Sequence, residues 1–159
     1  GGAVVAVSTP RRALLQTDFA PPPPVPNDAF SVSVGTLTEL RAQMIEPKVL
    51  TIYLTADITL DSRELPAVEK QLRILGACGT DGLKRCTLDA NRASRHVTVG
   101  ATGELELHNL LVTNGKAVGR PWADGGAIFC YGKLTALRVT FSDNKANDEG
   151  SSNGGGVAG

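Results

Sequence analysis

The chain has 159 residues, with 16 basic and 16 acidic side chains and a formal net charge of zero. A neutral chain lacks the positive field that attracts nucleic-acid backbones or anionic membranes, so neither is expected as a partner. Apolar residues make up 42% of the sequence, which excludes a wholly disordered chain. No apolar run approaches the ~20 residues of a membrane span. Aromatic residues are only 4%. We therefore expect one domain with an aliphatic core.

Residues 1–29 are expected to lie outside the fold, as a disordered leader and spacer. The run Pro21–Pro26 (Pro-Pro-Pro-Pro-Val-Pro) fixes φ and removes backbone donors. It therefore indicates a polyproline II spacer. A ligand for a proline-binding module is the alternative interpretation. The apolar start, Gly1–Val7, is either the tail of a signal peptide or a disordered terminus.

Residues 30–48 are predicted to form an N-terminal cap that contains a short helix. Thr36 and Glu39 have the spacing of a capping box. Apolar residues recur at helical spacing over 37–45, and Pro47 ends the helix. A helix here would cover the open end of the repeat that follows and protect its first strand edge.

Residues 49–159 are predicted to be stacked strands, because the sequence repeats at an offset of 30. Leu107–Asn114 aligns with Leu137–Asn144, and Val97 aligns with Ala127 and then with Val157. Apolar and polar residues alternate, and glycine, asparagine and aspartate separate the alternating runs, as in strands joined by tight turns. The expected strands centre on residues 50–54, 58–60, 72–75, 97–99, 105–107, 127–129 and 137–141.

This pattern predicts an all-β fold, a right-handed parallel β-helix with one coil per repeat. Asn114 and Asn144 align, and asparagines at equivalent corners can form a hydrogen-bonded ladder. Two independent turn asparagines are the alternative. The sequence ends within the opening of another repeat, Gly154–Gly159, so we expect the β-helix to be truncated at its C-terminus.

Two short motifs resemble a known repeat. Their residues are Gly125, Gly126, Ala127 and Ile128, followed by Phe141 and Asn144. The pair Gly-Gly-Ala-Ile and Phe-x-x-Asn resembles the repeat of chlamydial polymorphic outer-membrane proteins. Residues 50–159 resemble the wider pectin-lyase-like β-helix superfamily, and the start of the chain is similar to algal secreted proteins. The resemblance implies a surface protein with an adhesive role.

The three cysteines indicate an oxidising compartment. Cys78 and Cys86 bound a polar, glycine-containing loop, and we expect a disulfide between them. A metal knuckle is the alternative, but it needs four ligands and the chain has only two histidines. Cys130 lies in an expected strand and is predicted to be a small buried hydrophobe, with an intermolecular bridge as the alternative.

Known catalytic strings are missing from the sequence, including phosphate-binding loops, nucleophile elbows and zinc-protease motifs. We therefore assign no catalytic, cofactor-binding or metal-binding residues and expect no cofactor. Asp89, with Arg92 and Arg95, is the closest set to a lyase site, and we interpret it as a solvated corner. His96 and His108 are interpreted as ordinary surface or ladder histidines rather than a metal or acid–base pair.

Two further groups are candidate contacts. Asp143, Asn147, Asp148 and Glu149 offer oxygen ligands without the spacing of a calcium loop, so a solvated loop is expected. Trp122 is a candidate ligand contact, since an exposed indole can stack on a sugar or a partner. Packing over the edge of the coil is the alternative.

Together these observations predict a secreted or cell-surface, non-enzymatic β-helix module with a structural or adhesive role. Its expected partners are a surface carbohydrate or protein and further rungs of the same parent chain. The alternative is the N-terminal part of a carbohydrate-active β-helix enzyme, a polysaccharide lyase or hydrolase, whose catalytic rungs lie beyond residue 159.

Overall fold

The computed structural model describes residues 3–5, 30–117, 125–146 and 157–158, and these are mostly β. Their one α-helix, α2, spans Leu37–Ile45. The strands are β1 (Ala3–Val5), β2 (Ser31–Val34), β3 (Thr51–Leu54), β4 (Ile58–Thr59), β5 (Gln71–Gly76), β6 (Cys86–Asp89), β7 (Val97–Val99), β8 (Glu104–Thr113), β9 (Ile128–Cys130), β10 (Lys133–Ser142) and β11 (Val157–Ala158). The all-β prediction is confirmed at this level.

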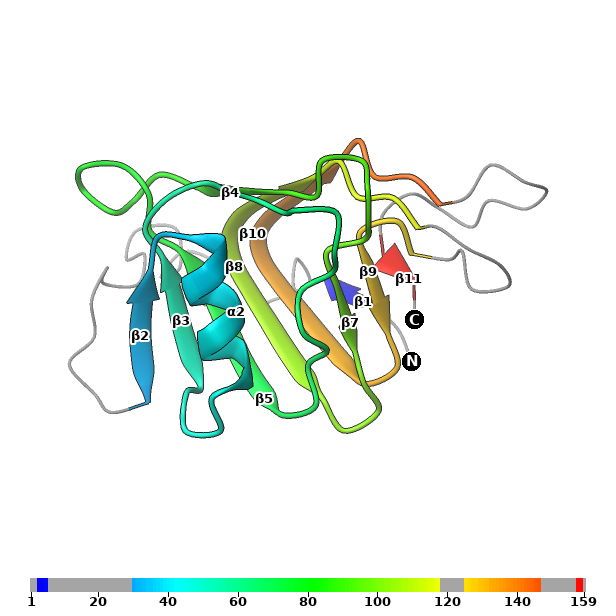
Figure 1. Cartoon of the computed structure of the whole chain (residues 1–159), viewed down its shortest axis with the longest axis horizontal. Coiled ribbons are helices and arrows are strands. Elements are labelled where there is room, and N and C mark those ends of the chain that lie inside the picture. The colour runs from blue at the N-terminus through cyan, green and yellow to red at the C-terminus, as the bar shows by residue number, and fades with distance from the viewer. Residues whose placement is uncertain (1–2, 6–29, 118–124, 147–156, 159) are drawn as a thin grey trace.

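All the paired strands run parallel (Figure 1). The larger sheet has the order β1-β10-β8-β5-β3-β2, with β6 also joined to β8 and β4 to β6, and the smaller sheet has the order β11-β9-β7. Parallel neighbours need a crossover connection, which in most proteins is a helix. Here α2 forms the crossover between β2 and β3, whereas the later crossovers contain strands instead. Three successive segments, which contain β5 to β7, β8 to β9 and β10 to β11, therefore pair through their strands in the same order.

The observed register differs by one residue from the predicted offset of 30. Leu107 lies opposite Ala136, at an offset of 29, rather than opposite Leu137. Val97 lies opposite Ile128, at an offset of 31, and Val157 also lies opposite Ile128. The predicted column of Val97, Ala127 and Val157 is therefore wrong, because Ile128 occupies its middle position. The offset is 31 from Val97 to Ile128 and 29 from Ile128 to Val157, so over both intervals a constant offset of 30 also fits the sequence.

A one-residue slip moves side chains to the opposite face of a strand. Ala136 is buried against the core and Leu137 points outward, although leucine is the more apolar of the two. In β9, Ile128 and Cys130 are buried and Phe129 is only partly buried. The alignment of Leu107 with Leu137 therefore placed Leu137 on the core face, where the structure has Ala136.

The two longest strands bend at equivalent positions. Asn109 in β8 and Arg138 in β10 both have a φ of 55°, in the left-handed region. At each of these residues the strand changes direction, so each strand has two halves. The first half of β8 pairs with β5 and its second half pairs with β6. The single strand β8 therefore pairs with two strands of the preceding segment, β5 and β6.

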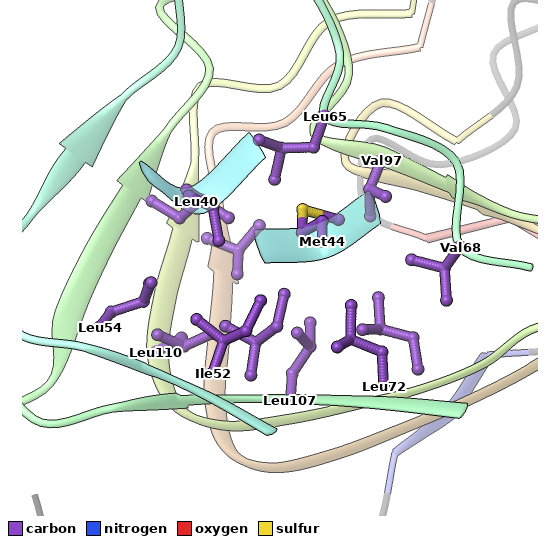
Figure 2. Packing of buried hydrophobic residues seen from close by; sticks show 14 of the residues in the cluster. Leu40, Met44, Ile52, Leu54, Leu65, Val68, Leu72, Val97, Leu107 and Leu110 are labelled. Carbon is purple, nitrogen blue, oxygen red and sulfur yellow. The ribbon is translucent and has the colours of Figure 1, made fainter. Parts of the chain in front are cut away.

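The core lies between the sheets and is built almost entirely from leucine, isoleucine and valine (Figure 2). Its largest fully buried side chains include Leu40, Ile52, Leu54, Leu72, Leu105 and Leu110. Burying a side chain of this size contributes about 1.5–3 kcal/mol. The predicted aliphatic core is confirmed, and Phe141 packs against it while partly buried.

The predicted helix and its cap are confirmed. Thr36 Oγ1 accepts a hydrogen bond from the Glu39 backbone N–H at 3.2 Å, and Glu39 Oε1 accepts one from the Gly35 N–H at 3.3 Å. Leu40 and Met44 are the buried residues of α2 and point into the core (Figure 2). The helix contacts β2 and β3, the first two strands of the larger sheet along the chain after β1.

The first residues differ from the expectation that 1–29 lie outside the fold. β1 pairs with β10, with Ala3 opposite Leu134 and Val5 opposite Ala136. The predicted spacer, Pro21–Pro26, lies outside the described residues. In the part of the chain that the structure describes, no helix is long and apolar enough to span a membrane.

Candidate functional site

A pocket of about 320 Å³ opens just beyond the ends of β6, β8 and β10. We call it the basic pocket. It is lined by Arg92, Gly115, Lys116, Asp143, Lys145 and Ala146. These residues follow the three strands by one to four positions, so the stacking of the strands brings them together. The cations come one from each of three successive segments.

The two lysines of the basic pocket lie in register. Lys116 and Lys145 form a parallel bridge, in which the Lys145 N–H donates to Gly115 O at 2.8 Å. The Ala117 N–H donates to Lys145 O at 3.0 Å. Arg92 lies on the other side, where its N–H donates to Asn114 O at 2.8 Å. The backbone hydrogen bonds of the strands thus continue into the wall of the pocket.

The chain turns sharply at this wall. Arg92, Asn114 and Asp143 all have a φ between 55° and 58°. Asparagine and aspartate tolerate this left-handed conformation well, whereas an arginine adopts it at a cost. Gly115 is required for a different reason, since a Cβ there would collide with the carbonyl of Gly126. These constraints give the pocket a fixed backbone frame.

The predicted asparagine ladder is wrong, because Asn114 and Asn144 are not in register. Asn114 lies at the position equivalent to Asp143, and its Nδ2 donates to Asp89 Oδ1 at 3.1 Å. Asn144 instead bridges to the neighbouring segment. Its Oδ1 accepts from the Gly115 N–H at 2.7 Å, and its Nδ2 donates to Val112 O at 3.0 Å. Both side chains brace the turn, each with its own partners.

Among the described residues, the cations of the basic pocket form no ion pair with an acidic side chain. The ion pairs of the described residues join Asp61 to Arg41 and Arg63, and Glu106 to Arg73 and His108. None of them involves the two lysines or the arginine that line the pocket. Asp143 is the single carboxylate among its described lining residues. The described lining of the pocket therefore carries an excess of positive charge.

No known protein family, curated protein or solved structure matches this chain.

The set of Asp89, Arg92 and Arg95 is not brought together as a site. Asp89 Oδ1 accepts from the Asn91 N–H at 2.7 Å and caps the turn. Arg92 lines the basic pocket. The Arg95 guanidinium lies 5.3 Å from the centre of the Phe129 ring, a cation–π geometry. The interpretation as a corner, rather than a catalytic set, agrees with these contacts.

An aromatic pair that the sequence analysis did not single out lies on the outer side of β9. The rings of Phe129 and Tyr131 have their centres 4.8 Å apart. Tyr131 is 58% exposed, so this pair, together with Arg95 beside Phe129, forms a partly open apolar patch. Strand alternation from the buried Cys130 could have placed both rings outward.

The two histidines have different surroundings. His96 is fully buried, and its Nε2 lies 3.0 Å from Leu88 O and 2.9 Å from Thr113 O. Because both partners accept, Nε2 carries the proton. Burial lowers the pKa of His96, and the hydrogen bonds to backbone carbonyls oppose this shift only in part. His108 lies on the outer face of β8 and contacts Glu106. His96 is therefore not a surface histidine, which corrects that part of the prediction.

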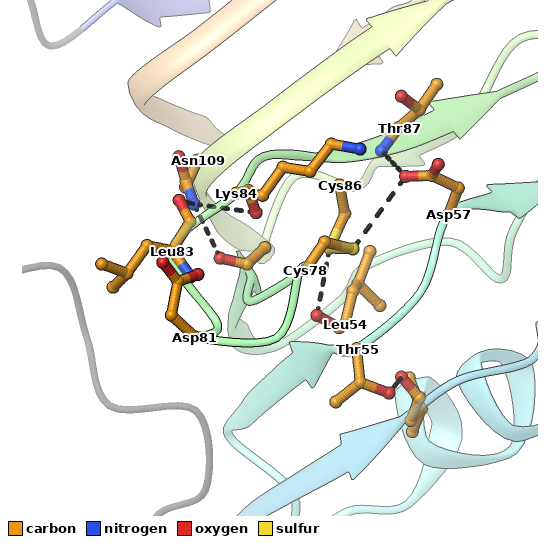
Figure 3. The surroundings of a disulfide bond; sticks show 12 residues. Leu54, Thr55, Asp57, Cys78, Asp81, Leu83, Lys84, Cys86, Thr87 and Asn109 are labelled. Carbon is orange, nitrogen blue, oxygen red and sulfur yellow. Dashed lines mark hydrogen bonds between the residues drawn. A yellow bond between two sulfur atoms is a disulfide. The ribbon is translucent and has the colours of Figure 1, made fainter.

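The predicted disulfide is present (Figure 3). Cys78 and Cys86 close a tight hairpin, in which the backbones of Cys78 and Lys84 exchange hydrogen bonds at 2.9 and 3.0 Å. Gly79 and Gly82 turn it with φ of 83° and 70°. The hairpin leaves the sheet between β5 and β6, at the level of the bend in β8. Cys130 is free and buried, as predicted, and burial raises the pKa of its thiol.

The glycines of the repeat motif have distinct positions. Gly125 has a φ of 66°, and the carbonyl of Gly126 packs against Gly115 of the basic pocket. Ala127 and Ile128 are buried. Trp122, Asn147, Asp148 and Glu149 lie outside the described residues. In the parts that are described, no three His, Cys, Asp or Glu side chains gather as metal ligands do.

Sequence analysis missed the two lysines of the basic pocket. Their signal was an offset of 29, which aligns Asn114-Gly-Lys116 with Asp143-Asn-Lys145. The predicted offset of 30 concealed it, because it set Lys116 against Ala146. Reading the turn residues rather than the leucines would have given the correct register.

Proposed function

We propose that the chain is part of a right-handed parallel β-helix, a secreted or cell-surface module with a structural and adhesive role rather than a catalytic one. The observation that carries this proposal is the parallel stacking of three successive segments, each with the same order of strands. A chain that coils around one core repeats its strands in this way.

The repeat motif supports the same architecture. Gly115 and Gly126 allow two successive segments to approach closely at one corner. The left-handed residues Asn114 and Asp143 turn the chain at equivalent points. Such corners recur at each coil of a β-helix, and the motifs resemble the repeats of surface adhesins. We extend that resemblance to the role of the protein.

The disulfide supports an extracellular or surface location, since structural disulfides persist where the environment is oxidising. The exposed faces support adhesion rather than turnover. The described residues present a basic pocket and an aromatic patch on their surface. A surface carbohydrate is the partner that this combination of side chains suits best.

The test is a pair of measurements on the full chain. Binding to immobilised acidic and neutral plant and algal polysaccharides is measured by biolayer interferometry, and the same polysaccharides are assayed for lyase and hydrolase products. We expect binding without product formation. Product that disappears when an acidic residue is mutated would overturn the proposal and favour a carbohydrate-active enzyme.

A crystal structure of the full chain tests the architecture separately. We expect the smaller and larger sheets to close around the aliphatic core with a right-handed coil. An open sheet, or a left-handed coil, would contradict the β-helix.

A further inference from the structure

We propose that the basic pocket binds the acidic groups, carboxylate or sulfate, of an anionic polysaccharide. This inference rests on the proposed adhesive function and names the ligand class of one surface. Its three cations, Arg92, Lys116 and Lys145, carry the recognition, and Asp143 opposes it.

The first argument is the register of the lysines. Lys116 and Lys145 lie opposite each other in a parallel bridge, and neighbouring strands are about 4.8 Å apart. Like charges at directly opposite positions destabilise a sheet. Within the described part of the chain neither lysine has an ion pair, whereas Asp61 and Glu106 are paired with other cations. An anion placed between the two ammonium groups would offset this repulsion.

The second argument is the backbone of the wall. Arg92 adopts a φ of 58°, a left-handed conformation that is unfavourable for residues other than glycine, asparagine or aspartate. Strained positions of this kind concentrate at functional sites. Asn144 and Gly115 fix the neighbouring turn through the 2.7 Å hydrogen bond between them. The cations are therefore attached to a frame that does not need to be ordered upon binding.

The third argument is the size and shape of the site. Its volume of about 320 Å³ is at the lower end of the range for small-molecule sites, enough for one sugar unit with its acidic group. The cations come from three successive segments, so positive charge extends along the stacking direction. A polymer with an acidic group on each unit could contact more than one of them at once.

A polysaccharide fits better than a nucleic acid. The chain has no net charge, so it lacks the overall positive field that attracts a nucleic-acid backbone. The described lining contains no aromatic side chain on which a base could stack. The disulfide also indicates an environment where acidic polysaccharides, rather than nucleic acids, are the abundant polyanions.

The experiment measures binding of the full chain to polygalacturonate, to dextran sulfate and to uncharged dextran. The double variant Lys116→Gln with Lys145→Gln removes both charges and keeps most of each side chain. Charge-assisted hydrogen bonds are stronger than neutral ones. We therefore expect the affinity of the double variant for both acidic polymers to fall about tenfold or more. Wild-type binding is expected to weaken as salt rises, and uncharged dextran is expected not to bind.

The matched control is Lys48→Gln with Lys133→Gln, which removes two exposed lysines that do not line the pocket. This control is expected to bind like the wild type. Asp143→Asn removes the opposing carboxylate at a position where asparagine tolerates the positive φ, so it is expected to bind more tightly. Arg92→Lys keeps the charge and is expected to retain binding.

Three results would overturn the inference. These are equal losses in the pocket and control double variants, equal binding to uncharged dextran, and equal or tighter binding to a single-stranded RNA of the same charge. Thermal unfolding of each variant identifies any loss of fold, and the gain expected for Asp143→Asn cannot arise from misfolding. Binding to neutral polysaccharide alone would reject this inference and leave the adhesive function standing, whereas polysaccharide cleavage would reject that function.

Discussion

The side-chain amide of Asn109 donates a hydrogen bond to the backbone carbonyl of Gly76, over 2.9 Å. Asn109 is 2% exposed and lies at the bend of β8, while Gly76 ends β5 where the disulfide hairpin leaves the sheet. The same amide reaches Leu83 O at 3.2 Å, inside the hairpin. One side chain therefore satisfies the backbone groups left open where a neighbouring strand is interrupted.

Replacing Asn109 by alanine is expected to destabilise the fold by about 2–3 kcal/mol. It removes a buried hydrogen bond worth about 1 kcal/mol and places a less tolerant residue at a φ of 55°. Urea unfolding measures the change. Asn109→Gly keeps the conformation and loses only the bond, so its cost is expected to be smaller. Asn91→Ala, an exposed position with a φ of 56°, isolates the backbone part. If Asn109→Ala cost no more than Asn91→Ala, the hydrogen bond would contribute nothing.

The Cys78–Cys86 disulfide closes a nine-residue loop, for which loop entropy predicts a stabilisation of about 2–3 kcal/mol. The double variant Cys78→Ala with Cys86→Ala is expected to lose about this much in urea unfolding. Cys130→Ala serves as the comparison, since Cys130 is buried and free.

Thiol titration checks the same assignment without mutation. The folded protein is expected to show no reactive thiol, the unfolded protein one, and the unfolded and reduced protein three. Two or more thiols in the unfolded, unreduced protein would show that the bridge is not formed.

His96 predicts a pH dependence of stability. Burial lowers its pKa in the folded state, while in the unfolded chain it keeps the ordinary value of about 6.5. The unfolded state therefore binds more protons below pH 6.5, and stability falls as the pH decreases from there towards the folded pKa. The slope approaches about 1.4 kcal/mol per pH unit. The carboxylate of Asp89 raises this pKa, but desolvation has the larger effect.

Urea unfolding between pH 5 and 7.5 measures this slope. Asp61, whose pKa Arg41 holds well below its ordinary value, loses its contribution mainly at lower pH, as it becomes protonated in the unfolded chain near pH 4. His96→Gln is expected to flatten the slope, and His108→Gln, on the outer face, to leave it. An unchanged slope in His96→Gln would show that another group is responsible.

Local patterns in the sequence predicted the elements well, because they depend on neighbours in the chain. The Thr36–Glu39 capping box, Pro47 and the alternation around Leu105 act within a few residues. The disulfide was also predictable, since its two cysteines bound a short polar loop. Five of the seven predicted strands match the observed bounds to within one residue, and the other two are parts of the ten-residue strands β8 and β10. The strands β1, β2 and β6 were not predicted.

Register and the pocket could not be obtained in the same way, because they depend on which residues of distant segments face each other. At the bends at Asn109 and Arg138 the alternation of buried and outward residues changes phase within one strand, although the offset between β8 and β10 stays at 29. A small core residue such as Ala136 gives a weaker apolar signal in the sequence than the outward-facing Leu137. The lysines of the basic pocket follow the turns, and their proximity appears only once the offset of 29 is known.

The register itself can be tested with two adjacent residues of β10. Ala136 is 2% exposed and faces the core, opposite Leu107, whereas Leu137 lies on the outer face, opposite His108. Ala136→Glu would place an unpaired carboxylate in the core, and we expect it to unfold the protein or to cost several kcal/mol. Leu137→Glu is expected to cost about 1 kcal/mol or less, since outward positions tolerate charge. Urea unfolding and circular dichroism of the two variants give the comparison. The offset of 30 predicts the opposite ranking of the two variants, with Leu137→Glu the more destabilising. The measurement therefore distinguishes the two registers.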